Sequence, residues 1–154
     1  RTVDDGAEGS RAVSYLLDTN VISELRKSKR QADSAVRQWV SGRSPIALHL
    51  SVVTVLEVEL GIARLGRQDP AQAERLQLWL EEDLLAVFGG RILPVDVSVA
   101  RRAARLHVPD PRPERDALIA ATALMSGLTV VTRNVADFDP MGVAVINPWG
   151  HPRR

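Results

Sequence analysis

Short apolar runs alternate along the chain with longer segments in which apolar residues recur every three to four positions. The short runs predict β-strands, because continuous apolar and β-branched residues are typical of buried strands. They cover residues 15–17, 46–50, 91–95, 128–132 and 143–146. Since helical segments separate the strands, the pattern predicts a mostly parallel sheet covered by helices on both faces.

The segments between the strands carry residue types that begin and end helices. Asp69 and Pro70 place an N-cap and a first-turn proline before a long helix that runs to about residue 88. Asp33 or Ser34 caps a short helix, and Gly127 ends a helix that is alanine-rich and apolar almost all round. Besides the long helix, the predicted helices cover residues 21–30, 35–40, 55–65, 97–107 and 114–126.

The length of the chain, 154 residues, fits a single domain. We expect a flexible N-terminal arm over residues 1–13, a domain over residues 14–150 and a short tail over residues 151–154. No run approaches the roughly 18 apolar residues that a membrane span needs. Cysteine is absent, which excludes disulfides, thiolate zinc sites and a cysteine nucleophile. We therefore expect a cytoplasmic protein that does not contact a membrane.

Charge is nearly balanced, with 20 Lys and Arg against 19 Asp and Glu. Bulk charge therefore gives no indication of nucleic-acid binding. The distribution is less even, because residues 99–115 hold five arginines and two carboxylates directly before Asp116. This segment is either a solvated helix face or a surface that contacts phosphates.

Two acidic residues follow predicted strands. Asp18 comes directly after residues 15–17, and Asp137 follows residues 128–132 by one turn. Functional groups of parallel α/β sheets gather beyond the carboxyl ends of the strands. Each residue also has a purely structural explanation, because Asp caps helices and because Asp137 and Asn134 are typical of turns.

Two further acids, Glu57 and Asp116, lie in the first turns of predicted helices. The helix dipole alone explains a carboxylate at either place, and Glu57 has Arg64 as a possible partner on its own helix. Helical periodicity puts Glu59, rather than Glu57, inside the apolar arc of that helix. Periodicity therefore does not select Glu57.

Taken together, the four acids predict a metal site. Carboxylates that are brought together repel one another and shift their pKa values unless a cation gathers them. Oxygen ligands without cysteine favour a hard cation, Mg²⁺ or Mn²⁺, and the three histidines are too scattered for a local zinc motif.

Four motifs, in this order and spacing, resemble the PIN-domain ribonucleases, specifically the VapC-type toxins of bacterial toxin-antitoxin pairs. They are Leu17-Asp18-Thr19-Asn20, the segment from Ser51 to Glu57 followed by Gly61, the segment from Asp116 to Ala123, and Val131-Thr132-Arg133-Asn134 with Asp137-Phe138. The resemblance covers about residues 14–149. It implies a PIN-like three-layer α/β/α sandwich with a central, mostly parallel sheet.

The resemblance also assigns roles to single residues. It implies a catalytic acidic site of Asp18, Glu57, Asp116 and Asp137, and so selects Glu57 over Glu59. Asp18 and Asp116 would hold Mg²⁺ or Mn²⁺, supported by Asn20, Thr132 and Asn134. Many PIN proteins have an acid where this chain has Asn134, so we expect Asp137 to substitute from the next turn.

The expected function is that of a metal-dependent endoribonuclease toxin that hydrolyses RNA phosphodiesters. Arg112 and Arg115 are expected to contact RNA phosphates. The resemblance further implies a homodimer and a cognate antitoxin whose C-terminal segment covers the site, and exposed positions of residues 21–30 and 55–65 are the expected contacts. The alternative is a catalytically weak PIN-fold module that binds RNA or a partner protein.

Three other classes fit less well. A phosphoacceptor domain needs a late lysine, and no lysine follows Lys29. Phosphatases with an aspartate nucleophile usually have a second aspartate where Asn20 stands. An esterase is not supported, because no G-x-S-x-G motif occurs.

Overall fold

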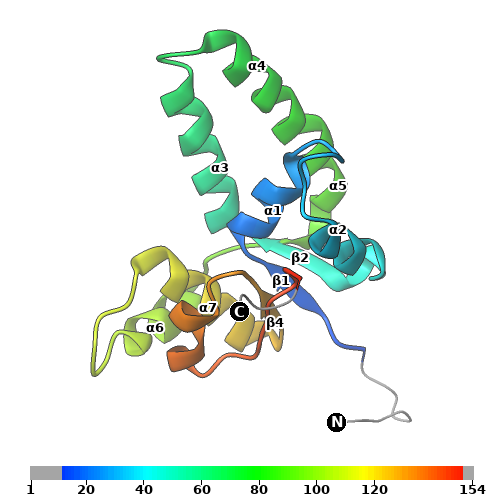
Figure 1. The fold of residues 1–154 in the computed structure, drawn as a ribbon. Helices are drawn as coiled ribbons and strands as arrows, with labels where there is room; N and C mark the ends of the chain where they lie inside the picture. Colours follow the sequence, from blue (N-terminus) through cyan, green and yellow to red (C-terminus); the bar gives the residue numbers. More distant parts are fainter. Residues whose placement is uncertain (1–11, 151–154) are drawn as a thin grey trace.

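Five short strands form one parallel sheet in the order β3-β2-β1-β4-β5 (Figure 1). The computed structural model describes residues 12–150, so the expected tail and all of the expected arm except Ala12 and Val13 lie outside the described residues. The strands are β1 (Tyr15–Leu17), β2 (Leu48–Ser51), β3 (Ile92–Leu93), β4 (Thr129–Val131) and β5 (Val145–Ile146). The expected parallel sheet is confirmed, with β1 at its centre.

Helices cover both faces of the sheet, which confirms the expected three-layer sandwich. Neighbouring strand residues point to opposite faces, so Leu16 packs in one core and Leu17 in the other, both fully buried. On the Leu17 side lie α1 (Thr19–Arg26), α2 (Ser34–Ser41), α3 (Val52–Leu65) and α4 (Pro70–Trp79). On the Leu16 side lie α6 (Val97–Leu106), α7 (Glu114–Ser126) and α8 (Val135–Phe138).

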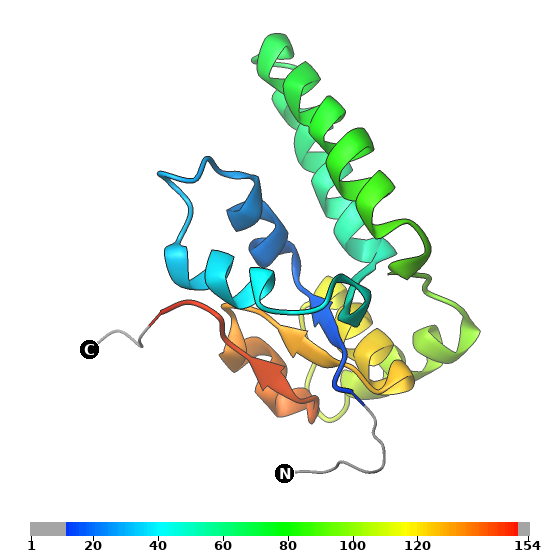
Figure 2. The same cartoon turned by 90° about the vertical axis from the view of Figure 1, so that its right-hand side faces the viewer.

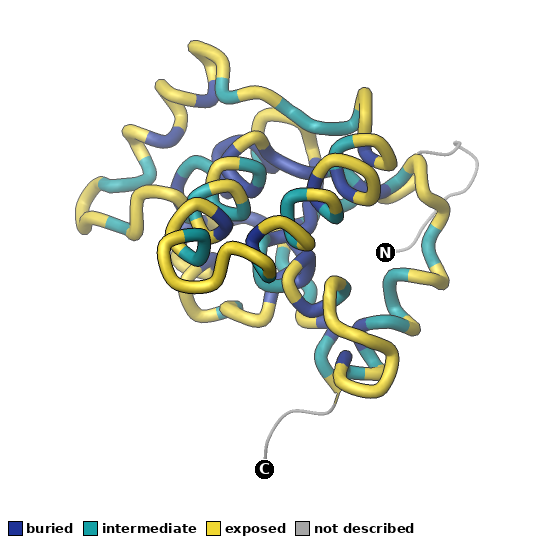
Figure 3. The backbone as a smooth tube through the Cα atoms, turned by 90° about the horizontal axis from the view of Figure 1, so that it is seen from above, coloured by how far each residue is buried: buried dark blue, intermediate teal, exposed yellow. Residues whose placement is uncertain are grey.

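Helices α3 and α4 form a hairpin that projects away from the sheet (Figures 1 and 2). Gly66 caps the end of α3, and the Asp69 carboxylate accepts a hydrogen bond from the Gln72 N–H at the start of α4. The expected long helix continues from α4 through a π-helical stretch, Leu80–Leu85, into α5 (Ala86–Phe88). Buried residues gather in the middle of the molecule, while much of the periphery is exposed (Figure 3).

Several element boundaries differ from those predicted. Helix α1 begins at Thr19 because the Asp18 carboxylate caps it, and it ends at Arg26 because the backbone of Lys27 is extended. A 3₁₀ turn, Pro45–Ala47, delays β2 to Leu48. Helix α3 begins three residues early, at Val52, because the Ser51 hydroxyl accepts a hydrogen bond from the Val53 N–H at 2.9 Å.

Two further differences affect the second half of the sheet. Strand β3 has two residues rather than five, since Pro94 follows it and has no N–H for a sheet hydrogen bond. The segment after β4, whose residues Asn134 and Asp137 are also typical of turns, contains the short helix α8. Among the described residues, no helix is both long and apolar enough to cross a membrane.

Candidate active site

Asp18 lies at the carboxyl end of β1 and is 5% exposed. One carboxylate oxygen accepts a hydrogen bond from the Thr19 N–H at 2.8 Å, and the other accepts one from the Thr132 hydroxyl at 2.7 Å. Burial raises the pKa of Asp18 above its ordinary value, although both hydrogen bonds oppose this effect. Asp18 therefore serves as a helix cap and also presents a buried carboxylate at the sheet edge.

The three expected supporting residues surround Asp18. The Asn20 amide donates to the Thr132 hydroxyl at 3.2 Å, and its carbonyl oxygen accepts from the Arg133 N–H at 3.3 Å. The Asn134 N–H also donates to the Thr132 hydroxyl, at 3.0 Å. Thr132 thus connects strand β4, helix α1 and the Asp18 carboxylate in one network.

Glu57 lies on α3 and is half-buried. The Thr19 hydroxyl donates a hydrogen bond to one of its carboxylate oxygens. The other oxygen lies 3.6 Å from the Arg115 guanidinium, so the partner is on α7 and is not Arg64. Glu59 is exposed, which corrects its placement in the apolar arc, because α3 belongs to the projecting hairpin and buries only part of its surface.

Asp116 lies in the first turn of α7, and Asp137 in the first turn of α8. Burial, together with the charges of Asp18, Asp137 and Glu57, raises the pKa of Asp116 to about 6. The charge of Asp137 raises the pKa of Asp18 as well. The structure thus brings all four sequence-predicted acids close enough to repel one another.

A cleft of about 470 Å³ opens at this edge of the sheet. Three of the acids line it, namely Asp18, Glu57 and Asp116, together with Asn20 and Asn134. Asp137 is exposed and is not one of the lining residues, so it acts on the cleft through its charge.

The donor set of the cleft suits a hydrated divalent cation. Its ligands are all oxygens, which favours Mg²⁺ or Mn²⁺. Within residues 12–150, no three acidic or histidine side chains converge closely enough to enclose an ion by themselves. Magnesium usually keeps several waters and binds through one or two carboxylates, a requirement that Asp18 and Asp116 satisfy.

The arginines expected to contact RNA have different surroundings. Arg115 is exposed beside the cleft and paired with Glu57. Arg112 is half-buried, and its side-chain Nε is enclosed without a hydrogen-bond partner. Arg101, Arg102 and Arg105 line a separate groove together with Met125. Met125 lies nine residues after Asp116 on α7, which separates the two residues by about 13 Å along the helix axis. These arginines therefore do not form one continuous rim around the acids.

Six residues that line the cleft are not among the predicted site residues, namely Thr19, Ser23, Glu24, Lys27, Arg133 and Trp149. Arg133 stands between Thr132 and Asn134 in the fourth motif, so the sequence itself indicates a position near the site. Trp149 lies far along the chain from every other lining residue except those near β4, and no local pattern indicates its position.

The fold and the cleft agree with comparisons to known proteins. A family model described as the PIN domain matches residues 15–140. The chain is 38% identical to the VapC ribonuclease Y4jK of Sinorhizobium fredii, over 87% of this chain and 96% of the relative. It is 40% identical to the toxin FitB of Neisseria gonorrhoeae, over 87% of this chain and 97% of the relative.

A solved structure agrees as well. The crystal structure of FitAcB from Neisseria gonorrhoeae superposes with a TM-score of 0.81 at 37% identity, covering 89% of this chain and 99% of the other. The chain belongs to the PIN-domain family, and within it to the VapC-type toxins of toxin-antitoxin modules.

Proposed function

We propose that this chain is an endoribonuclease that hydrolyses RNA phosphodiester bonds at the acidic cleft. One observation carries the proposal: four carboxylates from separate elements act on one another at the carboxyl edge of the sheet, and the innermost, Asp18, is held almost fully buried. Such repulsion costs stability in a metal-free protein, so a structural role for the cluster explains little. The name of the relative Y4jK, a VapC ribonuclease, supports the same reaction.

Asp18 and Asp116 are the proposed ligands of one Mg²⁺ or Mn²⁺, and Asp137 supports a second ion or its water shell. When bound, a divalent cation lowers the pKa of water and neutralises charge that develops on the phosphate. The Thr132 and Thr19 hydrogen bonds fix the Asp18 carboxylate before any ligand arrives. No covalent protein nucleophile takes part.

Glu57 is the proposed general base. It orients the attacking water and accepts its proton, which requires a carboxylate that is ionised and fixed in direction. The Thr19 hydroxyl donates to one carboxylate oxygen and the Arg115 guanidinium lies 3.6 Å from the other, so both oxygens are fixed in direction.

Cleavage of RNA by the purified protein with added Mn²⁺ tests this function. The Asp18→Asn, Asp116→Asn double variant should lose the activity, while Glu59→Gln, an exposed glutamate on the same helix as Glu57, should keep it. Undiminished cleavage by the double variant would refute the assignment. Calorimetric metal binding without cleavage would instead favour the alternative, a catalytically weak binding module.

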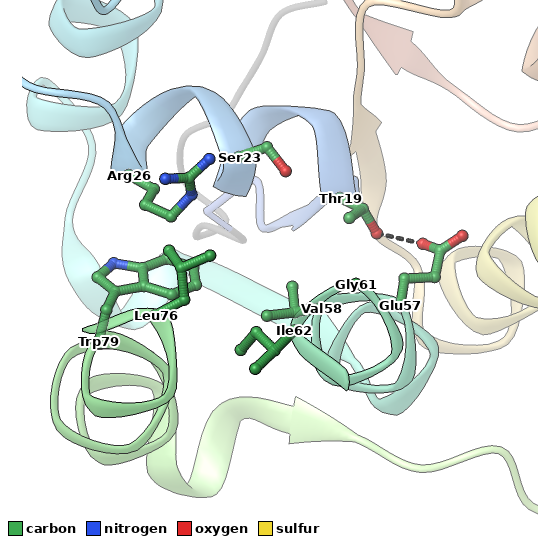
Figure 4. Close-up of a pocket in the computed structure, with 9 residues that line it drawn as sticks. All are labelled: Thr19, Ser23, Arg26, Glu57, Val58, Gly61, Ile62, Leu76 and Trp79. Carbon is green, nitrogen blue, oxygen red and sulfur yellow. Dashed lines mark hydrogen bonds between the residues drawn. The ribbon is translucent and has the colours of Figure 1, made fainter. Parts of the chain in front are cut away.

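We also propose that an antitoxin segment occupies a groove next to the cleft. The groove measures about 220 Å³ and lies between α1, α3 and α4 (Figure 4). Its floor is apolar, with Val58, Ile62, Leu76 and Trp79, and Arg26 lies at one end. Exposed residues of α1 and α3, such as Ser23 and Gly61, line it, as expected for the partner contacts.

The position of the groove explains how its occupant would inhibit the enzyme. Thr19, Ser23 and Glu57 line both the groove and the acidic cleft. A bound segment would therefore lie against the proposed general base.

Co-expression with the antitoxin followed by size-exclusion chromatography tests the complex, and the same experiment on the toxin alone tests the expected homodimer. RNA as substrate places the proposed activity in the cytoplasm.

A further inference from the structure

Trp149 and Arg133 lie together in the acidic cleft. The Arg133 guanidinium carbon is 5.1 Å from the centroid of the Trp149 ring, a cation–π contact. Both residues line the cleft that also contains Asp18, Glu57 and Asp116. The proposed chemistry uses neither of them.

We propose that Trp149 and Arg133 form a nucleotide subsite beside the scissile phosphate, in which an unstacked base stacks on the indole and Arg133 contacts a neighbouring phosphate. This inference rests on the proposed function, because it assumes that RNA enters the cleft. It concerns a single base, so it is compatible with the low aromatic content of the chain.

The surroundings of Trp149 differ from those of the other two tryptophans. Trp39 packs edge-on against Tyr15 with ring centroids 4.8 Å apart, and Trp79 lines the apolar groove. Trp149 packs partly against the core next to α2 and remains half-exposed in a cleft with polar walls. An aromatic ring that is anchored at the core and partly exposed in a cleft can stack an unpaired base once the Arg133 guanidinium, which lies over the ring in the free protein, turns toward a phosphate.

The charges in the cleft favour Arg133 as the phosphate contact. Lys27 also lines the cleft, but its ammonium lies 3.0 Å from the buried Glu24 carboxylate. Arg133 is exposed and pairs with no carboxylate in the part of the chain that the structure describes. Its guanidinium is therefore available to a phosphate, and the planar guanidinium group can donate two hydrogen bonds to phosphate oxygens.

The subsite is also tied to the catalytic residues. The Arg133 N–H donates to Asn20, which donates in turn to the Thr132 hydroxyl that holds Asp18. The cleft, at about 470 Å³, falls within the usual range for small-ligand pockets, roughly 300–1,000 Å³. A base that occupies it must leave its helical stack, so the subsite selects single-stranded or looped RNA over duplex RNA.

Binding of short oligoribonucleotides to the full chain, in a chelator that prevents cleavage, tests the subsite. Trp149→Leu keeps an apolar side chain but removes the aromatic face, and should weaken binding roughly 5- to 150-fold. Trp149→Phe should bind within about threefold of the wild type, since a smaller ring still stacks. An abasic oligonucleotide should bind equally to the wild type and to Trp149→Leu.

Equal binding of the base-bearing oligonucleotide to the wild type and to Trp149→Leu would overturn the proposal. An equal loss of affinity for the abasic one would overturn it too, because that result indicates a packing defect. Arg133→Gln should lower the slope of log affinity against log salt by about 0.7, whereas Arg101→Gln, in the remote groove, should leave it unchanged. Binding that depends on Trp149, in a protein that never cleaves RNA, would refute the proposed hydrolysis and support the subsite.

Discussion

The Arg115 guanidinium on α7 lies 3.6 Å from the Glu57 carboxylate on α3, so an ion pair joins the two helices beside the acidic cleft. Arg115 directly precedes Asp116 in the chain. It therefore brings a positive charge next to the four acids, which repel one another. Arg115, which the sequence predicts to contact RNA phosphates, thus lies beside Glu57, the proposed general base, in the free protein.

Arg115→Gln removes this charge while keeping a hydrogen-bonding side chain of similar length. We expect the rate of RNA cleavage to fall about tenfold, equivalent to about 1.4 kcal/mol of transition-state stabilisation, because Glu57 loses its ionic partner. Steady-state kinetics on a defined oligonucleotide measure this effect. Arg101→Gln is the matched control, and comparable rates for the two variants would contradict a role for the pair.

Thr132→Val replaces the hydroxyl that donates to Asp18 with a methyl group of the same shape. The variant removes the shorter of the two hydrogen bonds to this buried carboxylate oxygen and leaves only the Asn20 amide at 3.4 Å, so it should lower the free energy of unfolding by about 1–3 kcal/mol, with loss of cleavage. Thr122→Val is the control, since Thr122 is equally buried but bonds only to the Leu118 carbonyl of its own helix. Chemical denaturation should therefore give a smaller change for Thr122→Val than for Thr132→Val.

Asp116→Asn should stabilise the metal-free protein while abolishing cleavage. The pKa of Asp116 is about 6 in the folded state and 3.8 ordinarily, so the folded state binds its proton more tightly. The stability from this group is complete below about pH 4 and is lost as pH rises through about 6. At neutral pH the substitution should raise the free energy of unfolding by about 1 kcal/mol, after allowance for partial exposure.

Denaturation in a chelator at pH 4 and pH 8 checks this prediction. The difference between Asp116→Asn and the wild type should be small at the lower pH and clear at the higher one. If Asp116→Asn is less stable than the wild type at pH 8, repulsion between the acids does not lower the free energy of unfolding, and the prediction is wrong.

Gly61→Leu should separate inhibition from catalysis. A side chain added at Gly61 meets nothing within 4 Å of its Cβ, so the helix tolerates it, and leucine would fill the groove. We expect normal RNA cleavage and loss of the co-purified antitoxin. Ala63→Leu, on an exposed part of the same helix outside the groove, should keep the antitoxin, and its loss there would point to a different docking surface.

The predictable parts of this protein are those that depend on neighbouring residues in the chain. The strand before Asp18, the cap at Asp69 and the apolar character of α7 are local, and the parallel sheet follows from the alternation of elements. Glu57 is different, because helical periodicity alone favoured Glu59 and only the family motif pointed to Glu57. Helical periodicity gave the wrong residue because α3 extends beyond the sheet, where the apolar side of a helix need not be buried.

The contacts that complete the cleft could not be predicted in this way. Trp149 reaches the site only because β5 pairs beside β4 and returns the chain past α2. Arg115 contacts Glu57 because two helices about 50 residues apart in sequence pack side by side. Neither relationship has a short-range signal, and each depends on how the layers are assembled.

Strand β1 has hydrogen-bonded neighbours on both sides, β2 and β4, and Asp18 directly follows it. Local opening begins where the backbone is most exposed to solvent, and residues 67–71 at the tip of the projecting α3–α4 hairpin are all exposed, whereas Leu16 and Leu17 of the central strand are fully buried. Amide protons around Asp18 should therefore exchange only with global unfolding, and those at the tip of the hairpin much sooner. A protein that begins to unfold locally would therefore lose the groove proposed for the antitoxin before it loses the acidic cleft.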